Sequence, residues 1–177
     1  MDLAVICKEA AIEYVKADKD FEIAGTVVQN SDFLLLKNTD PIKFGISQNR
    51  KYQKDLVKYS YPDAEIAELL GNALPYALMS NQVDALVIDG IKAIGIEGTL
   101  EEPRVSADVD TYVLIVNRKF RSTEDYEIFV KLYNASVESL ADKTELIKVI
   151  KEIKGTELTD KDMEMVNTWK LKLLPIK

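Results

Sequence analysis

Short apolar runs alternate with segments of helical periodicity over the first two thirds of the chain. Residues 3–6 are apolar and are expected to form a strand. The segment 8–17 that follows places Ala11, Ile12 and Val15 at helical spacing and is expected to form a helix. Further strands are expected at 21–28, 33–37, 42–46, 64–70, 83–88 and 111–116, and further helices at 49–59 and 72–80, with a short helical piece at 91–96. Strands and helices alternating at these lengths indicate βαβ units, so the pattern predicts an α/β fold with mainly parallel sheets.

From Ser122 onward the pattern contains helices only. Three pairs of residues have the spacing of a capping box, in which an N-cap oxygen is followed three residues later by an acid. These pairs are Ser122 with Asp125, Asp142 with Glu145, and Thr159 with Asp162. The apolar stripes on these helices suit packing against a core. The sequence therefore predicts a helical C-terminal region.

Composition narrows the classes of function. The chain has 177 residues, of which 47% are hydrophobic, and a formal charge of −7 without any basic run, which disfavours nucleic acid as a partner. No stretch approaches the ~20 apolar residues of a membrane helix, so no membrane insertion is expected. With one cysteine and no histidine, neither an internal disulfide nor an ordinary zinc site is expected. We expect a cytoplasmic location for the chain as given, and an extracytoplasmic one if it is a piece of a longer protein.

The first candidate ligand site follows the strand expected at 42–46. Ser47, Gln48 and Asn49 lie between this strand and a helix, where free backbone N–H groups and polar side chains suit a small polar or anionic ligand. The alternative is that Ser47 or Asn49 only caps the helix. Asp89 ends a later strand, at the edge where open α/β sheets bind ligands. Because Gly90 follows it, Asp89 is equally compatible with a simple turn.

A second candidate site lies at the first strand–helix junction. Cys7 precedes the helix that begins with Lys8 and Glu9, and a helix N-terminus lowers the pKa of a thiol. No histidine is present to act as its base, so an inert, packed cysteine is the competing interpretation. We include Cys7 and Glu9 among the candidate ligand-binding residues.

The order of these elements resembles the nitrate/sulfonate/taurine-type substrate-binding proteins of ABC transporters, which have a type II periplasmic-binding-protein fold. The motifs that carry the resemblance are 2–6 with 9–11, 25–29 with 33–37, 45–48, 82–89 and 112–120. The resemblance implies a second lobe at 39–102 and a first lobe made of 1–38 plus about 103–177. That first lobe is incomplete, because the family carries a further βαβ portion and an export signal ahead of the matching strand. The implied function is non-catalytic binding of a small molecule, without a cofactor.

Two alternatives remain open at this stage. The same scaffold hosts small-molecule enzymes of menaquinone- or thiamin-precursor type, since a fold does not decide function. An incomplete lobe also leaves strand edges that a second copy or a partner chain could cover, which would make the protein a homodimer or an interaction protein. Tyr52, Tyr59 and Tyr61 are candidate contact residues for such a partner.

Overall fold

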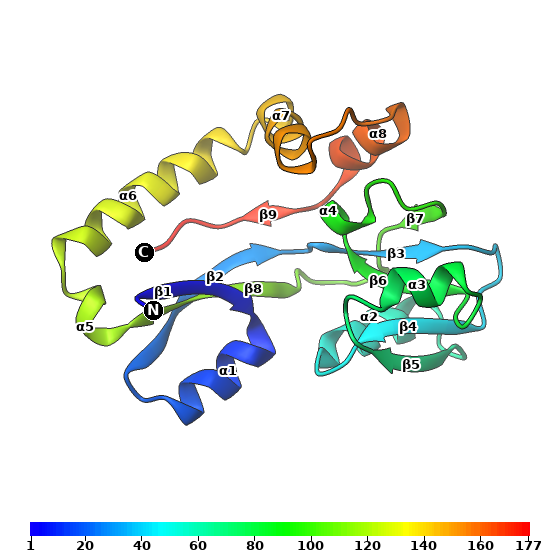
Figure 1. The fold of residues 1–177 in the computed structure, drawn as a ribbon, viewed down its shortest axis with the longest axis horizontal. Helices are drawn as coiled ribbons and strands as arrows, with labels where there is room; N and C mark the ends of the chain where they lie inside the picture. The colour runs from blue at the N-terminus through cyan, green and yellow to red at the C-terminus, as the bar shows by residue number, and fades with distance from the viewer. The chain divides into compact units, whose positions relative to one another are not determined.

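The computed structural model describes all residues 1–177, and the chain divides into two compact units (Figure 1). The first unit combines Met1–Asn30 with Val109–Lys177, and the second is Ser31–Asp108. These divisions differ from the expected ones at 38/39 and 102/103. The difference arises because strand β3, Asp32–Leu36, pairs with strands β6 and β7 of the second unit, so that residues 31–38 belong there.

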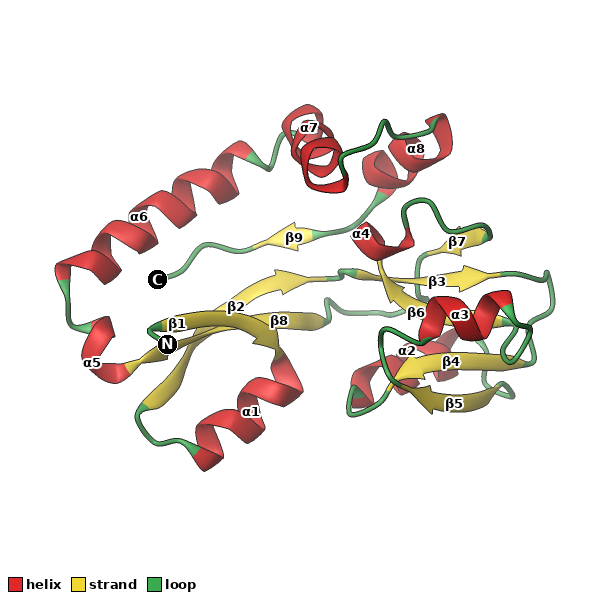
Figure 2. Cartoon of the chain, viewed as in Figure 1, coloured by secondary structure: helices red, strands yellow, loops and turns green.

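The first unit contains a four-stranded antiparallel sheet with the strand order β1-β8-β2-β9. Its strands are β1 (Leu3–Cys7), β2 (Phe21–Gln29), β8 (Asp110–Asn117) and β9 (Lys172–Leu173). Its helices are α1 (Lys8–Ala17), α5 (Arg118–Arg121), α6 (Glu124–Ser139), α7 (Lys143–Lys154) and α8 (Asp160–Thr168). Figure 2 shows the run of helices α5 to α7 joined by short loops.

Alternation along β8 gives this sheet two apolar faces. Val113 and Ile115 pack with Ala11 of α1 on one face, whereas Leu114 and Val116 pack with Tyr126 of α6 on the other. In Figure 1, α1 and α6 accordingly lie on opposite sides of the sheet. The long apolar run of β8 is thus explained by burial on both faces.

The second unit contains a five-stranded mixed sheet with the strand order β5-β4-β6-β3-β7. Its strands are β3 (Asp32–Leu36), β4 (Lys43–Ser47), β5 (Glu65–Leu69), β6 (Ala85–Asp89) and β7 (Thr99–Glu101). Its helices are α2 (Lys51–Ser60), α3 (Leu74–Met79) and α4 (Gly90–Ala93). The pairs β4·β5 and β4·β6 are parallel, as the strand–helix alternation from residue 41 onward predicts.

The prediction of mainly parallel sheets is wrong for the rest of the protein. Strands β1 and β2 flank β8 and both run antiparallel to it, so the unit β1-α1-β2 is a crossover whose two strands are parallel but not adjacent. In the second unit β3 is antiparallel to both of its neighbours. In the two-lobed arrangement that the family resemblance implies, residues 33–37 and 111–116 are neighbouring strands near the crossover between the lobes, but in the structure they belong to different sheets. A strand distant in sequence can insert between two local ones, and local periodicity carries no sign of it.

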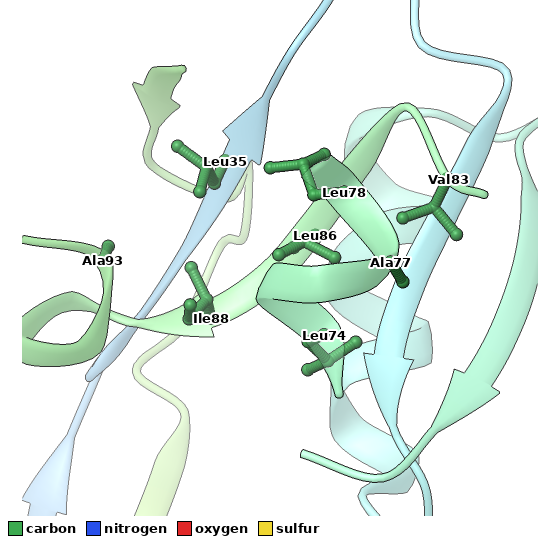
Figure 3. Close-up of a cluster of buried hydrophobic side chains, with 8 residues drawn as sticks. All are labelled: Leu35, Leu74, Ala77, Leu78, Val83, Leu86, Ile88 and Ala93. Carbon is green, nitrogen blue, oxygen red and sulfur yellow. The ribbon is translucent and has the colours of Figure 1, made fainter. Parts of the chain in front are cut away.

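The core of the second unit lies between its sheet and helices α3 and α4. Figure 3 shows this cluster, with Leu86 of β6 near its centre. The cluster is Leu35, Leu74, Ala77, Leu78, Val83, Leu86, Ile88 and Ala93. Gly45 of β4 is small for a packing reason, since a Cβ there would lie 2.9 Å from Leu86 Cδ2 and 3.0 Å from Leu74 Cδ2. Helix α3 therefore packs directly against the backbone of β4.

The predicted helix starts in the C-terminal region are confirmed with small shifts. Thr159 and Asp162 form the full capping box of α8, and Asp142 caps α7 through the Thr144 amide. Helix α6 is capped by Thr123, not by Ser122. No helix of the protein is both long enough and apolar enough to cross a membrane.

Candidate functional site

Polar side chains of the second unit converge at one end of its sheet, the edge formed by the carboxyl ends of β4 and β6. Strands β4 and β6 are parallel and end at Ser47 and Asp89, so their carboxyl ends meet at this edge. Strand β3 runs antiparallel to β6 and begins there at Asp32, which is paired directly with Asp89. Residues opposite each other in an antiparallel pair project to the same face, so the Asp32 and Asp89 side chains are neighbours. The predicted candidates Ser47 and Asp89 thus come together at one edge.

Asp32 is the centre of a buried hydrogen-bond network. It is only 5% exposed, and its Oδ2 accepts hydrogen bonds from Tyr52 Oη at 2.7 Å and Gln53 Nε2 at 2.8 Å. Its Oδ1 accepts from Ser31 Oγ at 3.1 Å. Arg50 Nη1 donates in turn to Tyr52 Oη at 3.3 Å. Charge-assisted hydrogen bonds of this kind are what allow a carboxyl group to be buried.

Gln53 connects this network to the loop after β4. It is 1% exposed, and its Oε1 accepts from the Ser47 backbone N–H at 2.8 Å while its Nε2 donates to Asp32. The side-chain amide therefore uses both ends, which sets its orientation without ambiguity. Asp32 and the Ser47 backbone are held together through a single buried glutamine.

Asp89 is the second acid of the site, and its pKa is raised above the ordinary value of 3.8. Burial is the first cause, because it disfavours the charged carboxylate, and the nearby Asp32 adds to it. The backbone N–H of Ile91 donates to Asp89 Oδ1 at 3.0 Å and opposes the shift, as does the charge of Lys92. The Asp89 side chain thereby caps α4, which confirms the turn-forming role that the sequence left open.

Replacing Asp89 with asparagine should make the protein more stable at neutral pH. The raised pKa means that ionising Asp89 costs more in the folded chain than in the unfolded one, so the associated stability is complete below the unfolded value of 3.8 and is lost as pH rises through the raised pKa. Asparagine carries no charge and still accepts the Ile91 N–H. In urea denaturation over a pH series, Asp89→Asn and the wild type should converge in acid and diverge in favour of the variant toward pH 7. A difference that does not change with pH would show that the charge is not its cause.

The expectation of free backbone N–H groups at residues 47–49 is wrong for Ser47 and Gln48. Ser47 N–H donates to Gln53, Gln48 N–H donates to Leu69 O at 2.8 Å, and Arg50 N–H donates to Ser47 O at 3.2 Å. Asn49 has a positive φ of 64°, a turn conformation that asparagine tolerates. Helix α2 starts only at Lys51, and no side chain caps it, so neither Ser47 nor Asn49 is a cap. The amides of Ser47, Gln48 and Arg50 are therefore engaged within the protein, which favours the side chains of this loop as ligand contacts.

Cys7 and Glu9 belong to the first unit, at the junction of β1 and α1. Cys7 is a free, half-buried thiol, and it precedes α1 without capping it through its side chain. Glu9 Oε2 is buried and has no hydrogen-bond partner. Unsatisfied buried oxygens are uncommon in native proteins, so Glu9 remains a ligand candidate on this observation.

Asp110 forms the main polar contact of the same junction. Lys8 Nζ lies 2.8 Å from Asp110 Oδ2, and Gln29 Nε2 donates to Asp110 Oδ1 at 2.8 Å. Burial alone would raise the pKa of Asp110, but the hydrogen bonds from Lys8 and Gln29 outweigh it and lower the pKa below 3.8. This ion pair ties the start of α1 to β8.

The sequence pattern did not point to Asp32, Gln53 or Arg50 as residues of this site, and it suggested Tyr52 as a contact for a partner chain. Asp32 lies in the turn-prone run 30–32, and only its long-range pairing with Asp89 shows its role. Of the tyrosines proposed as partner contacts, Tyr52 donates to Asp32, and Tyr61 donates to Glu101 Oε2 at 2.9 Å. Polar residues at the start of a helix that follows a strand were the one signal that could have pointed to Arg50 and Gln53.

A cavity of about 690 Å³ lies elsewhere, between α6, α7 and the C-terminal segment of the first unit. Its lining is mostly apolar, with Val137, Leu140, Leu146 and Leu173 among the contributors. None of the residues predicted to bind a ligand lines it. No group of three or more Cys, Asp or Glu side chains in the protein could hold a metal ion.

Solved structures of substrate-binding proteins share this fold. The ligand-binding component of an ABC-type import system from Staphylococcus aureus, with zinc bound, has a TM-score of 0.75 at 13% identity, over 99% of this chain and 68% of that one. The periplasmic aliphatic sulphonate binding protein from Escherichia coli has a TM-score of 0.67 at 14% identity, over 100% and 69%. A nutrient binding protein from Burkholderia cenocepacia bound to methionine has a TM-score of 0.58 at 17% identity, over 81% and 76%.

No protein-family model matches the sequence, and no curated protein matches it. At these identities, agreement with solved structures demonstrates the fold. The chain has the α/β fold of type II periplasmic-binding proteins, in the form found in substrate-binding components of ABC-type importers. It is shorter than the chains that share this fold. The resemblance drawn from the ordered motifs is confirmed at the level of fold.

Proposed function

We propose that the protein is a non-catalytic binding protein for a small zwitterionic molecule, held at the edge where β4 and β6 end. The observation that carries the proposal is the pairing of Asp32 with Asp89 at that edge, together with the hydrogen bonds that join Asp32 to Arg50 through Tyr52. Open α/β sheets bind ligands outside the carboxyl ends of their parallel strands. The fold shared with the binding component of an importer, with a sulphonate binding protein and with a nutrient binding protein bound to methionine supports the same function class.

The charges at the site favour a ligand that carries both signs. An ammonium group suits the two carboxylates, because a cation close to Asp89 relieves the repulsion from Asp32 and stabilises the ionised form. An acid group suits the Arg50 guanidinium, which presents a planar fork of donors. A simple anion is less well matched than we expected from the sequence, since the amides of Ser47, Gln48 and Arg50 are already used.

Thermal shift with three matched compounds tests the proposal. At a ligand concentration 100 times its Kd, a free amino acid should add about 2.7 kcal/mol of stability, or roughly 5–11 °C in Tm for a chain of this size. The N-acetyl derivative lacks the ammonium group and the carboxamide derivative lacks the acid group. Each derivative should give a much smaller shift, because each leaves one side of the site without its counter-charge.

The matched protein variants are Asp89→Asn and Asp55→Asn. Asp55 is exposed on α2 and should leave the shift unchanged, whereas Asp89→Asn should reduce the shift from the free amino acid. The proposal fails if amino acids, sulfonates, carboxylates and pyrimidines at high concentration leave Tm unchanged, or if both variants respond like the wild type.

Proton-transfer chemistry at the same pair of acids is the second candidate function. One carboxyl group with a raised pKa beside another acid is an arrangement that enzymes use for acid–base catalysis. NMR spectra of a stabilising ligand incubated with the protein separate the two candidates. An unchanged ligand supports binding alone, and a chemical change that Asp89→Asn abolishes supports catalysis.

Location and assembly also belong to the proposal. We infer an extracytoplasmic location by analogy with the periplasmic protein that shares its fold. We infer a homodimer from the exposed strand β1 in the first unit.

A further inference from the structure

Among the outermost strands of the two sheets, β1 is the only one that has five residues and carries no charged side chain. The four strands at the ends of the two sheets are β1, β9, β5 and β7. Strand β9 has two residues and β7 has three, and β5 carries Glu65 and Glu68, all features that discourage pairing with another chain. Strand β1 has five residues with the sequence Leu-Ala-Val-Ile-Cys, and Val5 at its middle is 47% exposed. An edge of this kind is a template for a further strand.

The backbone groups that face the open side of β1 follow from its pairing with β8. Asn117 N–H donates to Asp2 C=O at 2.8 Å, and Leu3 is paired with Val116. In an antiparallel ladder the residues that bond to one neighbour alternate with those that point away. Asp2, Ala4 and Ile6 therefore bond toward β8. The N–H and C=O groups of Leu3 and Val5 and the N–H of Cys7 point to the open edge, whereas the Cys7 C=O, at the N-cap of α1, accepts the first hydrogen bond of that helix.

This edge is complementary to itself. When two copies of β1 pair antiparallel about a two-fold axis at Val5, Val5 lies opposite Val5 and exchanges two hydrogen bonds with it. Leu3 lies opposite Cys7, whose N–H donates to the Leu3 C=O, because the Cys7 C=O is used by α1. The same register brings the Asp2 end of each strand toward the Cys7 end of the other, where Lys8 begins α1. Lys8 also pairs with Asp110 of its own chain, but an ammonium group has three donors. Opposite charges thus meet at both ends of the uncharged strand.

The elements packed on the sheet leave this edge open. Ala11 of α1 is buried against Phe21 of β2 and Val113 and Ile115 of β8, and Ala4 and Ile6 of β1 are partly buried against the same cluster. On the other face, α6 packs on Leu114 and Val116 of β8. Both helices therefore cover the middle of the sheet, and Val5 at its border stays accessible.

We propose that two copies of this chain associate through β1, forming one continuous antiparallel sheet across a two-fold axis at Val5. The interface lies in the first unit, and the proposed ligand site lies in the second. The dimer and the ligand site can therefore fail independently, and the measurements below involve no ligand.

Light scattering coupled to gel filtration tests the dimer. The 20.0 kDa chain should elute with twice that mass, and Val5→Pro should elute with the mass of one chain. The Val5 N–H points away from β8, so proline removes no hydrogen bond within the protein but blocks the edge. Val5→Lys is a second disrupting variant, because it places like charges opposite each other. Ile153→Lys alters an exposed apolar residue on α7 and should leave the dimer intact.

A cross-link tests the register itself. In a Cys7→Ser background, Val5→Cys should form a disulfide-linked dimer under mild oxidation, since hydrogen-bonded antiparallel pairs have Cα atoms about 5.5 Å apart, within disulfide range. A wild-type chain that stays monomeric up to high concentration overturns the proposal. It is equally overturned by Val5→Pro and Val5→Lys variants that fold, by circular dichroism, and remain dimeric. A dimer in which Val5→Cys does not cross-link excludes the register.

Discussion

Replacing Asp32 with alanine should lower the free energy of unfolding by about 2–5 kcal/mol, the range for removing one partner from a buried charged network. Asp32 is 5% exposed and accepts from Tyr52, Gln53 and Ser31. Alanine would leave the donor of Gln53, which is 1% exposed, buried without an acceptor. Urea denaturation followed by circular dichroism measures the loss. Fluorescence would not, because the only tryptophan, Trp169, is in the first unit.

Two control variants make this result specific. Asp32→Asn retains one acceptor oxygen and the same shape, so its loss should be clearly smaller than that of alanine. Asp55→Ala removes an exposed acid from α2 and should change stability by no more than about 0.5 kcal/mol. If Asp32→Ala is no more destabilising than Asp55→Ala, the buried network does not stabilise the second unit.

Truncating Leu86 to alanine should cost a comparable amount, about 2–5 kcal/mol, because a cavity would remain in a packed core. Leu86 is fully buried in the cluster of Figure 3 and lies against Gly45 of β4. The same change at Leu70, which is 58% exposed, is the matched control and should cost less than about 1 kcal/mol. Equal losses at Leu86 and Leu70 would contradict the assignment of the core to this face of the sheet.

Periodicity and turn residues in the sequence predict most of the helices and strands. The order of the strands in each sheet depends on pairing between segments that are distant in the sequence. The strand at 42–46 and the helices on either side of residues 64–70 follow from periodicity and turn residues, and the structure has them within a few positions. The place of β8 between β1 and β2 does not follow, since the two flanking strands come from residues about a hundred positions away. Strands β7 and β9 are too short to produce a periodic pattern.

The site shows the same division between local and distant information. Ser47 and Asp89 could be placed because each ends an apolar strand, and the edge where parallel strands end is a known location for ligands. Asp32 could not, because it comes at the beginning of its strand and reaches this edge only through antiparallel pairing. Of the free amides expected after β4, that of Ser47 donates to the Gln53 side chain and that of Gln48 donates to Leu69 O. The sequence marks Gln53 only as a polar residue near the start of a helix that follows a strand, and this does not show that its side chain is buried.

The central claim is that a small zwitterion binds at the β4 and β6 edge of the second unit. NMR amide mapping of ¹⁵N-labelled protein titrated with a mixture of free amino acids tests it most directly. We predict chemical-shift changes concentrated at residues 31–33, 47–53 and 89–92. Amide spectra that do not change, or changes confined to residues 1–30 and 109–177, would contradict the claim.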